Sequence, residues 1–572
     1  MKPTIQLLVK RWGRLPLFGL MATVLLLSVA ACSTDDPTPT SAPAATPTTA
    51  AQVFDATSTS LEACPPLKPT LKVAGYFAVD FSPHPAETRF NSTHYTRLHQ
   101  MPLFGADPKE TDVDADYGVA ESWEFSADGS SLTIHVRDGL TFNNGDSITA
   151  EDVAFSIDLA KSEFADSQIN GTLQGIGITP VVLDPATLRL DFAKGAVTFP
   201  IEVSPMVFPL YVTSKAYHSN GAITQEAFDA FRANPLAAGP YQVVDREVDQ
   251  FINLEAARRD PLLGCPVYER LEIRNIQETG TRVAQFQTGQ QHIVAASYDL
   301  IARAEDLDAV ITTKPSAGMI GLYIFQTYNE DNVFNDINVR KAAAYAIDKE
   351  LIGDTIFQGT GITPWGCTWP PNTEISAANP RYIAACGTPY PYEPATAQEY
   401  LQKAGYPVGE GPTIRLEYSN SYSEEADMAA AMQPMLNAVG FDAVLAQVDR
   451  AERNRRRAED NGHNDTLLFF APGGRLTSLA GSYSVLGPDR KWGPKQDADV
   501  VSALAAASAA TTLDEYTNAT ADLGQAVYDG AHAPGFFSSA EVWFASKEVG
   551  NWGLEQSRGR GPLNLAALVT KK

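Results

Sequence analysis

Helical and strand patterns alternate through much of this 572-residue chain. Between residues 424 and 471 the pattern runs helix (424–439), strand (443–448), helix (450–460) and strand (465–471). Such alternation is typical of a mostly parallel or mixed sheet that is covered by helices. The sequence therefore predicts an α/β fold.

Earlier segments predict local structure of the same class. Residues 71–77 predict a first buried strand, and residues 121–142 predict a hairpin that turns at Asp128-Gly129. Thr149 then caps a helix, and Asp152 at the third helical position completes a capping box. Nothing in these segments indicates catalysis, so we interpret them as scaffold.

The chain is large and strongly acidic. Apolar residues make up 44% of it, and the formal net charge is −25. About 510 residues follow the first sixty, which is too many for one domain of the usual ~100–200 residues, so two or three lobes are expected. The acidic charge argues against nucleic-acid partners and anionic lipid, which require clustered Lys and Arg.

The start of the chain predicts export. A basic stretch precedes residues 15–31, which are nearly all apolar but too short and too Pro/Gly-marked for a resident membrane span. Residues 1–31 therefore read as a signal peptide, and Val29-Ala30-Ala31-Cys32 resembles a bacterial lipobox. Cys32 is then the lipid attachment site, anchored through its acyl chains. The alternative is an ordinary secreted protein with an incidental cysteine.

Residues 32–61 predict a tether. They contain almost no large apolar side chains, so they cannot bury enough surface to offset the entropy of ordering. We expect a disordered leash that holds the globular body near a membrane.

Four further cysteines predict two disulfides, because an even number outside the cytoplasm favours pairing. They are Cys64, Cys265, Cys367 and Cys386. Of three possible pairings we favour Cys367–Cys386, which closes a Pro-rich loop, and Cys64–Cys265, which fastens the start of the body to a later strand. The close spacing that a metal site needs is absent from these cysteines.

Four blocks then carry a family resemblance: residues 119–157, 234–244, 334–352 and 390–406. They resemble solute-binding protein family 5 of ABC importers, which includes dipeptide-, oligopeptide- and nickel-binding proteins. The resemblance extends from about residue 70 to 545. It implies a periplasmic-binding-protein-like fold of two α/β lobes with mixed sheets, joined by a hinge, which close around a ligand in the cleft between them.

The resemblance also implies a domain plan. Lobe I is expected at 62–90, 205–315 and 533–572, with an inserted subdomain at 91–204, and lobe II at 316–532. The expected function is capture of a peptide or other amphipathic solute outside the cytoplasm and its delivery to permease subunits with cytoplasmic ATPases. The protein is expected to act as a lipid-anchored monomer on the bacterial membrane, without a cofactor.

One loop departs from the peptide-binding members of the family, in which an Asp pairs with the ligand's ammonium. The corresponding stretch is residues 466–483, and the acid's place falls near Pro472, followed by Gly473, Gly474 and Arg475. A buried ammonium without a partner is costly, which disfavours peptides with a free amine. Arg475 instead suits a carboxylate, a phosphate or sugar hydroxyls, with close backbone approach at the two glycines. The alternative is that Arg475 pairs with a surface acid.

Aromatic residues supply further ligand-binding candidates. Trp365 and Trp369 lie where the family places cleft-lining residues, and Tyr76 and Phe77 end the first predicted strand. Stacking indoles suit apolar or sugar ligands. Packing in the core is the alternative for each of them.

Two sets of polar residues, three histidines and one basic run, are interpreted as structural and not as binding sites. His84, His94 and His99 have spacings that place no two on one helical face, so we expect isolated positions on the surface and no metal site. Residues 450–460 form a basic run that we expect to be an exposed helix with internal ion pairs; docking to the permease or to lipid is the alternative.

An enzyme is the least favoured alternative. The chain lacks G-x-S-x-G, H-E-x-x-H and S-x-x-K motifs and both phosphate-loop glycine patterns. A lipid-anchored hydrolase would need such machinery. A sensing or receptor lipoprotein of the same fold that does not serve transport is the other alternative.

Overall fold

The structure is a computed structural model. It describes residues 61–572 except 76–80, 90–91, 108–112, 168, 325, 361, 368–378, 420–422, 450–451, 453–454, 457–464, 472–496, 557–562 and 570–572. Among the residues it describes, no helix combines the length and apolar character that crossing a membrane requires.

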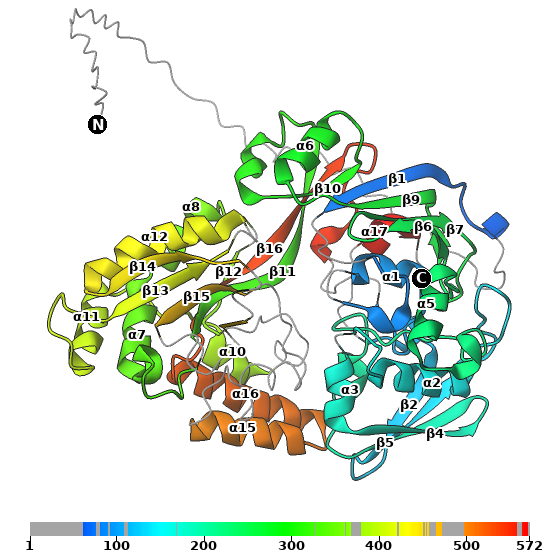
Figure 1. Ribbon diagram of the computed structural model, residues 1–572, viewed down its shortest axis with the longest axis horizontal. Coiled ribbons are helices and arrows are strands. Elements are labelled where there is room, and N and C mark those ends of the chain that lie inside the picture. Colours follow the sequence, from blue (N-terminus) through cyan, green and yellow to red (C-terminus); the bar gives the residue numbers. More distant parts are fainter. Residues whose placement is uncertain are drawn as a thin grey trace, which may run out of the picture. The chain divides into compact units, whose positions relative to one another are not determined.

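A large mixed sheet organises this part of the chain (Figure 1). Its strands follow the order β14-β13-β15-β11-β16-β10-β1-β9-β7-β6, and β12 also pairs with β16. Their bounds are β1 (Lys68–Gly75), β6 (Tyr241–Glu247), β7 (Phe251–Ala256), β9 (Tyr268–Asn275), β10 (Ile293–Ala296), β11 (Ala309–Ile324), β12 (Thr363–Pro364), β13 (Thr413–Tyr418), β14 (Asp442–Gln447), β15 (Thr466–Ala471) and β16 (Gly535–Ser546).

Two parallel groups of strands are joined by antiparallel ones. β1 is parallel to both β9 and β10, and β13 is parallel to both β14 and β15. Between these groups, β11 and β16 pair antiparallel along most of their length, with β16 against β10 and β11 against β15. The predicted α/β class is confirmed, and the mixed sheet arises from these two long strands.

A smaller antiparallel sheet has the order β2-β3-β5-β4. Its strands are β2 (Ala120–Phe125), β3 (Ser131–Val136), β4 (Ile178–Asp184) and β5 (Thr187–Phe192). The predicted hairpin is confirmed as β2–β3, with Gly129 at φ +67°, a value that glycine adopts easily. The capping box of Thr149 and Asp152 is also confirmed at the start of the following helix. A further short pair joins β8 (Cys265–Pro266) to β17 (Leu568–Val569).

Helices cover these sheets (Figure 1). They are α1 (Thr93–His99), α2 (Ala150–Lys161), α3 (Asn170–Ile176), α4 (Phe199–Glu202), α5 (Gln225–Ala233), α6 (Thr279–Gln287), α7 (Ile337–Ala346), α8 (Lys349–Ile356), α10 (Pro380–Cys386), α11 (Pro394–Lys403), α12 (Ser423–Val439), α15 (Ala498–Ala509), α16 (Leu513–Asp529) and α17 (Leu563–Ala567).

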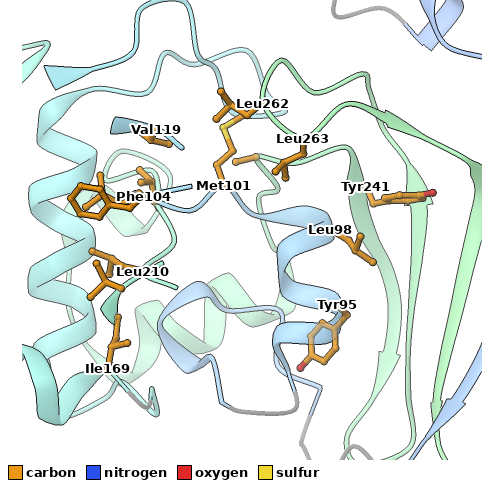
Figure 2. Packing of buried hydrophobic residues seen from close by; sticks show 14 of the residues in the cluster. Tyr95, Leu98, Met101, Phe104, Val119, Ile169, Leu210, Tyr241, Leu262 and Leu263 are labelled. Carbon is orange, nitrogen blue, oxygen red and sulfur yellow. The ribbon is translucent and has the colours of Figure 1, made fainter. Parts of the chain in front are cut away.

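Two large hydrophobic clusters form the interior. The first core combines β1, β7, β9 and the smaller sheet with α1 and α2, and Figure 2 shows part of it around Met101 and Leu262. The second core combines β13, β14 and β15 with α7, α8, α11 and α12. Two cores agree with the expectation of more than one lobe, whereas the residue boundaries of the domain plan remain predictions.

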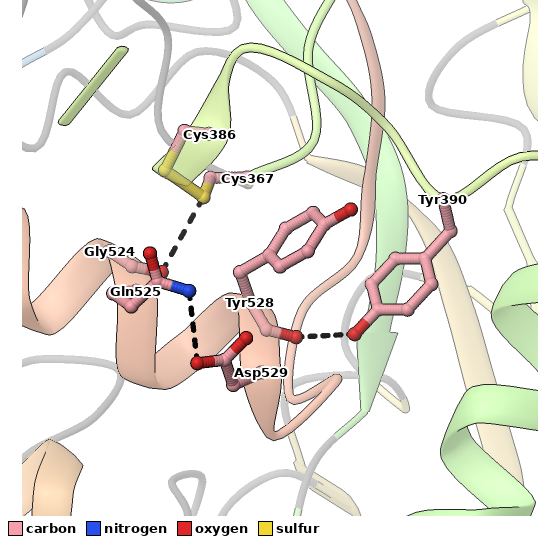
Figure 3. Close-up of a disulfide and its surroundings, with 7 residues drawn as sticks. All are labelled: Cys367, Cys386, Tyr390, Gly524, Gln525, Tyr528 and Asp529. Carbon is pink, nitrogen blue, oxygen red and sulfur yellow. Dashed lines mark hydrogen bonds between the residues drawn. A yellow bond between two sulfur atoms is a disulfide. The ribbon is translucent and has the colours of Figure 1, made fainter. Parts of the chain in front are cut away.

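Both predicted disulfides are confirmed. Cys64 and Cys265 are joined across a sequence separation of 201, and Cys367 and Cys386 across one of 19. The second disulfide lies against α16, where the Cys367 Sγ is 3.7 Å from the carbonyl oxygen of Gly524 (Figure 3). A Cβ on Gly524 would lie 3.1 Å from the Cys386 Sγ, so the close approach of helix and disulfide favours glycine there.

Candidate functional site

The candidate site lies where the parallel strands end. Ligands of open α/β sheets bind beyond the carboxyl ends of parallel strands. β1 ends at Gly75 and the residues after it lie outside the described part of the chain, but β10 is followed directly by Ser297 and Tyr298. Tyr298 therefore lies at the carboxyl end of a parallel strand, where a ligand would bind.

Tyr298 connects the end of β10 to β16. Its hydroxyl accepts a hydrogen bond from the backbone N–H of Ala540 on β16, at 3.0 Å, and donates one to the carbonyl oxygen of the same residue. Burial raises the pKa of Tyr298, and the negative charges of Glu424 and Glu541 raise it further. The end of β10 and the middle of β16 therefore meet at this phenol, which is neutral at pH 7.

An ion pair lies on the neighbouring strands β11 and β16. Lys314 on β11 is only 5% exposed, and its Nζ lies 3.8 Å from the Glu541 Oε1. The indole Nε1 of Trp543 donates a hydrogen bond to the Glu541 Oε2 at 3.2 Å. A buried ammonium needs compensation, and Glu541 provides part of it.

His94 brings α1 into the same group. Its ring centroid lies 6.1 Å from that of Trp543. Burial lowers the pKa of His94 to about 4, while Glu541 opposes this shift and Lys314 adds to it. At pH 7 the imidazole is therefore neutral, and the charges of the group are the Lys314 cation and the Glu541 anion.

The arrangement is suited to polar recognition. We call Lys314, Glu541, Trp543, His94 and Tyr298 the crossing cluster, because β11 and β16 pair with both parallel groups of the sheet. It offers a cation, an anion and three aromatic side chains with polar atoms. Within the described part of the chain, no three His, Cys, Asp or Glu residues gather as metal ligands would.

Most site residues predicted from the sequence lie outside the described residues. They are Cys32, Tyr76, Phe77, Trp369, Gly473, Gly474 and Arg475. Trp365 is described: it is 4% exposed, and its ring centroid lies 6.0 Å from that of Tyr382, in a hydrophobic cluster with the Cys367–Cys386 disulfide. Packing accounts for the position of Trp365. Lipid attachment at Cys32 and contact with a ligand at the other predicted residues stay predictions.

The expected surface position of three histidines is wrong. His84, His94 and His99 are all buried. The His84 ring stacks on Phe228 with centroids 4.2 Å apart, and its Nε2 lies 3.0 Å from the Nε2 of His218. Helical spacing shows which residues share a face, but it does not show whether tertiary packing covers that face.

The basic run is also only partly exposed. Arg455 forms the expected ion pair with Glu452, at 2.7 Å. Arg456, however, is buried, where it pairs with Glu417 on β13 and donates a hydrogen bond to the Thr466 Oγ1 on β15 at 3.1 Å. Because a buried carboxylate requires a partner, this arginine fastens the segment to the sheet.

Sequence reasoning missed the crossing cluster. A signal for it is present: Lys314 and Glu541 are single charges within otherwise apolar or small-residue strands. Charges in such strands are expensive unless they are paired. Their partnership could not be seen, because the two residues are far apart in the sequence.

Comparison with known proteins now identifies the family. Residues 115–474 match the model of the bacterial extracellular solute-binding proteins, family 5 Middle. The glutathione-binding protein GsiB of Salmonella typhi is 25% identical over 409 residues, covering 69% of this chain and 73% of that protein. Heme-binding protein A of Haemophilus influenzae is 29% identical over 326 residues, covering 53% of this chain and 56% of that protein.

Solved structures show the same fold. NikZ from Campylobacter jejuni, in complex with Ni(L-His), superposes with a TM-score of 0.69 at 20% identity, covering 86% of this chain and 98% of that one. DppA from Helicobacter pylori, in complex with the peptide STSA, has a TM-score of 0.68 at 19% identity and covers 88% and 98%. The chain has the two-lobed, mixed α/β fold of these binding proteins, and it belongs to the bacterial extracellular solute-binding proteins of family 5, the substrate-binding proteins of ABC importers.

Proposed function

We propose that this protein is a lipid-anchored receptor that captures a peptide or other amphipathic solute between two lobes and passes it unchanged to a permease with cytoplasmic ATPases. Its family membership supports the transport role. The observation that carries the proposal is the crossing cluster, because the buried Lys314 and the partly exposed Glu541 place a charged pair on the strands that join the two parallel groups. Closure signals occupancy only if the solute binds the closed state more tightly.

The predicted domain plan assigns the segments that form each lobe. Residues 62–90, 205–315 and 533–572 form lobe I, residues 91–204 its inserted subdomain, and residues 316–532 lobe II. In this plan β11 and β16 contribute the hinge, since they pair with each other while β11 pairs with β15 of one group and β16 pairs with β10 of the other. The protein works as a monomer, because one chain supplies both walls of the cleft.

Lipid attachment at Cys32 and a tether over residues 32–61 keep the receptor near its permease. Confinement to a thin layer at the membrane raises the effective concentration of receptor at the permease. The Cys32→Ser variant tests the anchor: it should leave the membrane fraction while the folded body binds solute as before. If the variant stays in the membrane fraction, Cys32 is not the anchor.

The solute is proposed to carry an anionic group. The relatives bind varied molecules. Two of them are named as glutathione-binding and heme-binding proteins, and two solved structures contain Ni(L-His) and a peptide. In this chain the place of the acid that peptide-binding members carry falls near Pro472, and Gly473, Gly474 and Arg475 follow it. Arg475 therefore binds a carboxylate or phosphate, and Trp369, Tyr76 and Phe77 line the apolar part of the site.

The decisive experiment has two steps. Native mass spectrometry first identifies the solute that co-purifies with the protein. Calorimetry with that solute then compares the wild type with Arg475→Ala and with the matched control Arg381→Ala, whose arginine is exposed and pairs with Asp522. Loss of a charge-assisted hydrogen bond should weaken binding by about tenfold to a hundredfold in the first variant only. Equal affinity in all three proteins would show that Arg475 does not bind an anionic group of the solute.

A further inference from the structure

One hollow of the molecule lies away from the crossing cluster, on the open face of the large sheet. Along β1, the side chains of Leu71 and Val73 enter the first core, so that of Lys72 lies on the opposite face. On β9, Glu272 and Arg274 lie on this same open face. They line a hollow of about 490 Å³, within the range of roughly 300–1,000 Å³ that is usual for small-molecule sites.

Amide side chains dominate the rim of this hollow. Five of them line it, contributed by the ends of β7 and β9, the last turn of α6 and the turn after it: Gln250, Asn275, Gln285, Gln290 and Gln291. Each amide presents both donor and acceptor atoms, which suits a ligand with several hydroxyl groups. We call this site the amide-lined hollow.

One of these amides is incompletely paired. Gln291 is 4% exposed, and its Nε2 donates a hydrogen bond to the Gln285 Oε1 at 3.0 Å. Its Oε1 is buried and has no hydrogen-bond partner among the described residues. A buried polar atom without a partner is costly, so this oxygen is placed to accept a hydrogen bond from a bound molecule.

The charges of the hollow leave one cation uncompensated. Glu272 lies 3.6 Å from both the Arg270 Nε and the Arg274 Nη2, and the Arg274 guanidinium also lies over the Phe251 ring, 5.4 Å from its centroid. Lys72 faces Glu272 in the strand register, but in the described part of the chain its ammonium has neither an ion pair nor a hydrogen bond. With Lys72, Arg274 and Glu272, the lining carries one net positive charge in a chain of −25.

We propose that the amide-lined hollow is a second binding site, separate from the cleft, for an acidic sugar: a hydroxylated ring that bears one carboxylate. The carboxylate pairs with Lys72, and the ring hydroxyls bond to the amides, one of them donating to the Gln291 Oε1. Ile276 and Phe251 provide apolar surface for the carbon face of the ring.

The same features disfavour a multiply charged phosphate. The rim is formed by the carboxyl end of α6, where the helix dipole is negative, and Glu272 adds a further negative charge. A phosphate site would instead use clustered cations or a helix amino terminus. A ligand with a single negative charge and many hydroxyls fits both constraints.

Calorimetry on the full mature protein tests the site with D-glucuronate, D-glucose and acetate as probes. Glucuronate should bind with one-to-one stoichiometry, and more tightly than glucose, which lacks the charge, or acetate, which lacks the hydroxyls. Lys72→Met should weaken glucuronate binding by about tenfold to a hundredfold. The matched control is Lys68→Met on the same strand, since Lys68 lies over the Tyr268 ring and outside the hollow; it should bind glucuronate like the wild type.

Three results would overturn the proposal. The first is no saturable binding of glucuronate by the wild type. The second is equal binding by wild type and Lys72→Met, with thermal unfolding confirming that both are folded. The third is loss of glucuronate binding in Arg475→Ala or on addition of the co-purified solute, which would place the sugar in the cleft. Failure of the Arg475 contact, in contrast, would leave the amide-lined hollow unaffected.

Discussion

The first and second cores both bury ionisable groups, but the groups differ. The helix that packs into the first core carries buried histidines, His94 and His99. The second core has a buried lysine, Lys349, at the start of α8. Burial disfavours the charged form of each, yet their ordinary pKa values are far apart. Burial therefore makes the stability of the first core depend on acidic pH and the stability of the second core depend on alkaline pH.

In the first core the sensitive range is acidic. Burial lowers the pKa of both His94 and His99 from 6.5 to about 4. The His99 ring is held by the carbonyl oxygens of Tyr95 and Pro83, at 3.1 and 3.4 Å, and these contacts oppose the shift. Between pH 6.5 and 4 the unfolded chain binds more protons than the folded one, so stability falls as the pH falls.

In the second core the sensitive range is alkaline. The Nζ of Lys349 donates hydrogen bonds to the carbonyl oxygens of Ala344 and Ile347, at 2.7 and 2.9 Å, and lies over the Phe536 ring. Burial nevertheless lowers the pKa of Lys349 from 10.5 to about 7, with Asp348 opposing the shift. Between pH 7 and 10.5 the unfolded chain again binds more protons, so this contribution to stability grows as the pH rises.

The largest effect is expected on acidification. Together, His94 and His99 should lower the free energy of unfolding by about 7 kcal/mol as the pH falls from about 7.5 to about 3, at 1.36 kcal/mol per pKa unit. Urea unfolding across this range measures the loss, and hydrogen exchange should show α1 opening before α12. His94→Phe should reduce the slope, whereas the exposed His135→Gln should not. Equal slopes in all three proteins would contradict the assignment of acid sensitivity to the first core.

The alkaline effect of Lys349 is expected to be somewhat smaller, about 5 kcal/mol in all as the pH rises from about 6 to about 11.5. Lys349→Met should remove this pH dependence, while Lys403→Met, at a residue stacked on Tyr400, should retain it. Chemical unfolding at pH 7, 8.5 and 10 provides the measurement. An unchanged pH slope in Lys349→Met would show that the lysine is not the source.

The two disulfides should also differ. In the chain-entropy model, the Cys64–Cys265 bond, which spans 201 residues, contributes about 5 kcal/mol, and the Cys367–Cys386 bond, which spans 19, contributes about 3 kcal/mol. Replacing each pair by alanines and measuring unfolding at constant pH gives the difference. Equal losses would indicate that loop length does not govern the stabilisation.

The smallest effect concerns the strands between the cores. Trp543→Phe removes the N–H that the indole donates to Glu541 and should cost about 1.5 kcal/mol, because the acceptor is charged and partly exposed. Trp552→Phe is the matched control, since the Trp552 indole donates to the neutral Thr312 hydroxyl at 2.9 Å. A smaller loss for Trp543→Phe than for the control would contradict the role of the charged pair.

Much of the fold could be predicted because it depends on local patterns. The β2–β3 hairpin, the capping box at Thr149 and the α/β alternation each involve neighbouring residues. The disulfide pairing was also predicted, partly because few arrangements are possible for four cysteines. The pairing of β11 with β16 joins segments that are far apart in the sequence, and no local pattern specifies it.

The candidate site was harder to predict for the same reason. Lys314 and Glu541 become partners only through that long-range pairing, and His94 joins them through the packing of α1. The sequence instead indicates Arg475 and the two glycines before it, through resemblance to family members. Family patterns identify where ligand contacts recur, whereas the charges of this chain's own interior appear only in three dimensions.

The proposed function requires that two lobes close around a solute and release it unchanged. Small-angle scattering of the purified protein, first stripped of its co-purified solute and then saturated with it, measures this closure, and mass spectrometry of the solute afterwards shows whether it is unchanged. The radius of gyration should fall on saturation, and the recovered solute should have its original mass. An unchanged radius of gyration at saturation, or conversion of the solute to another product, would rule out the proposed function.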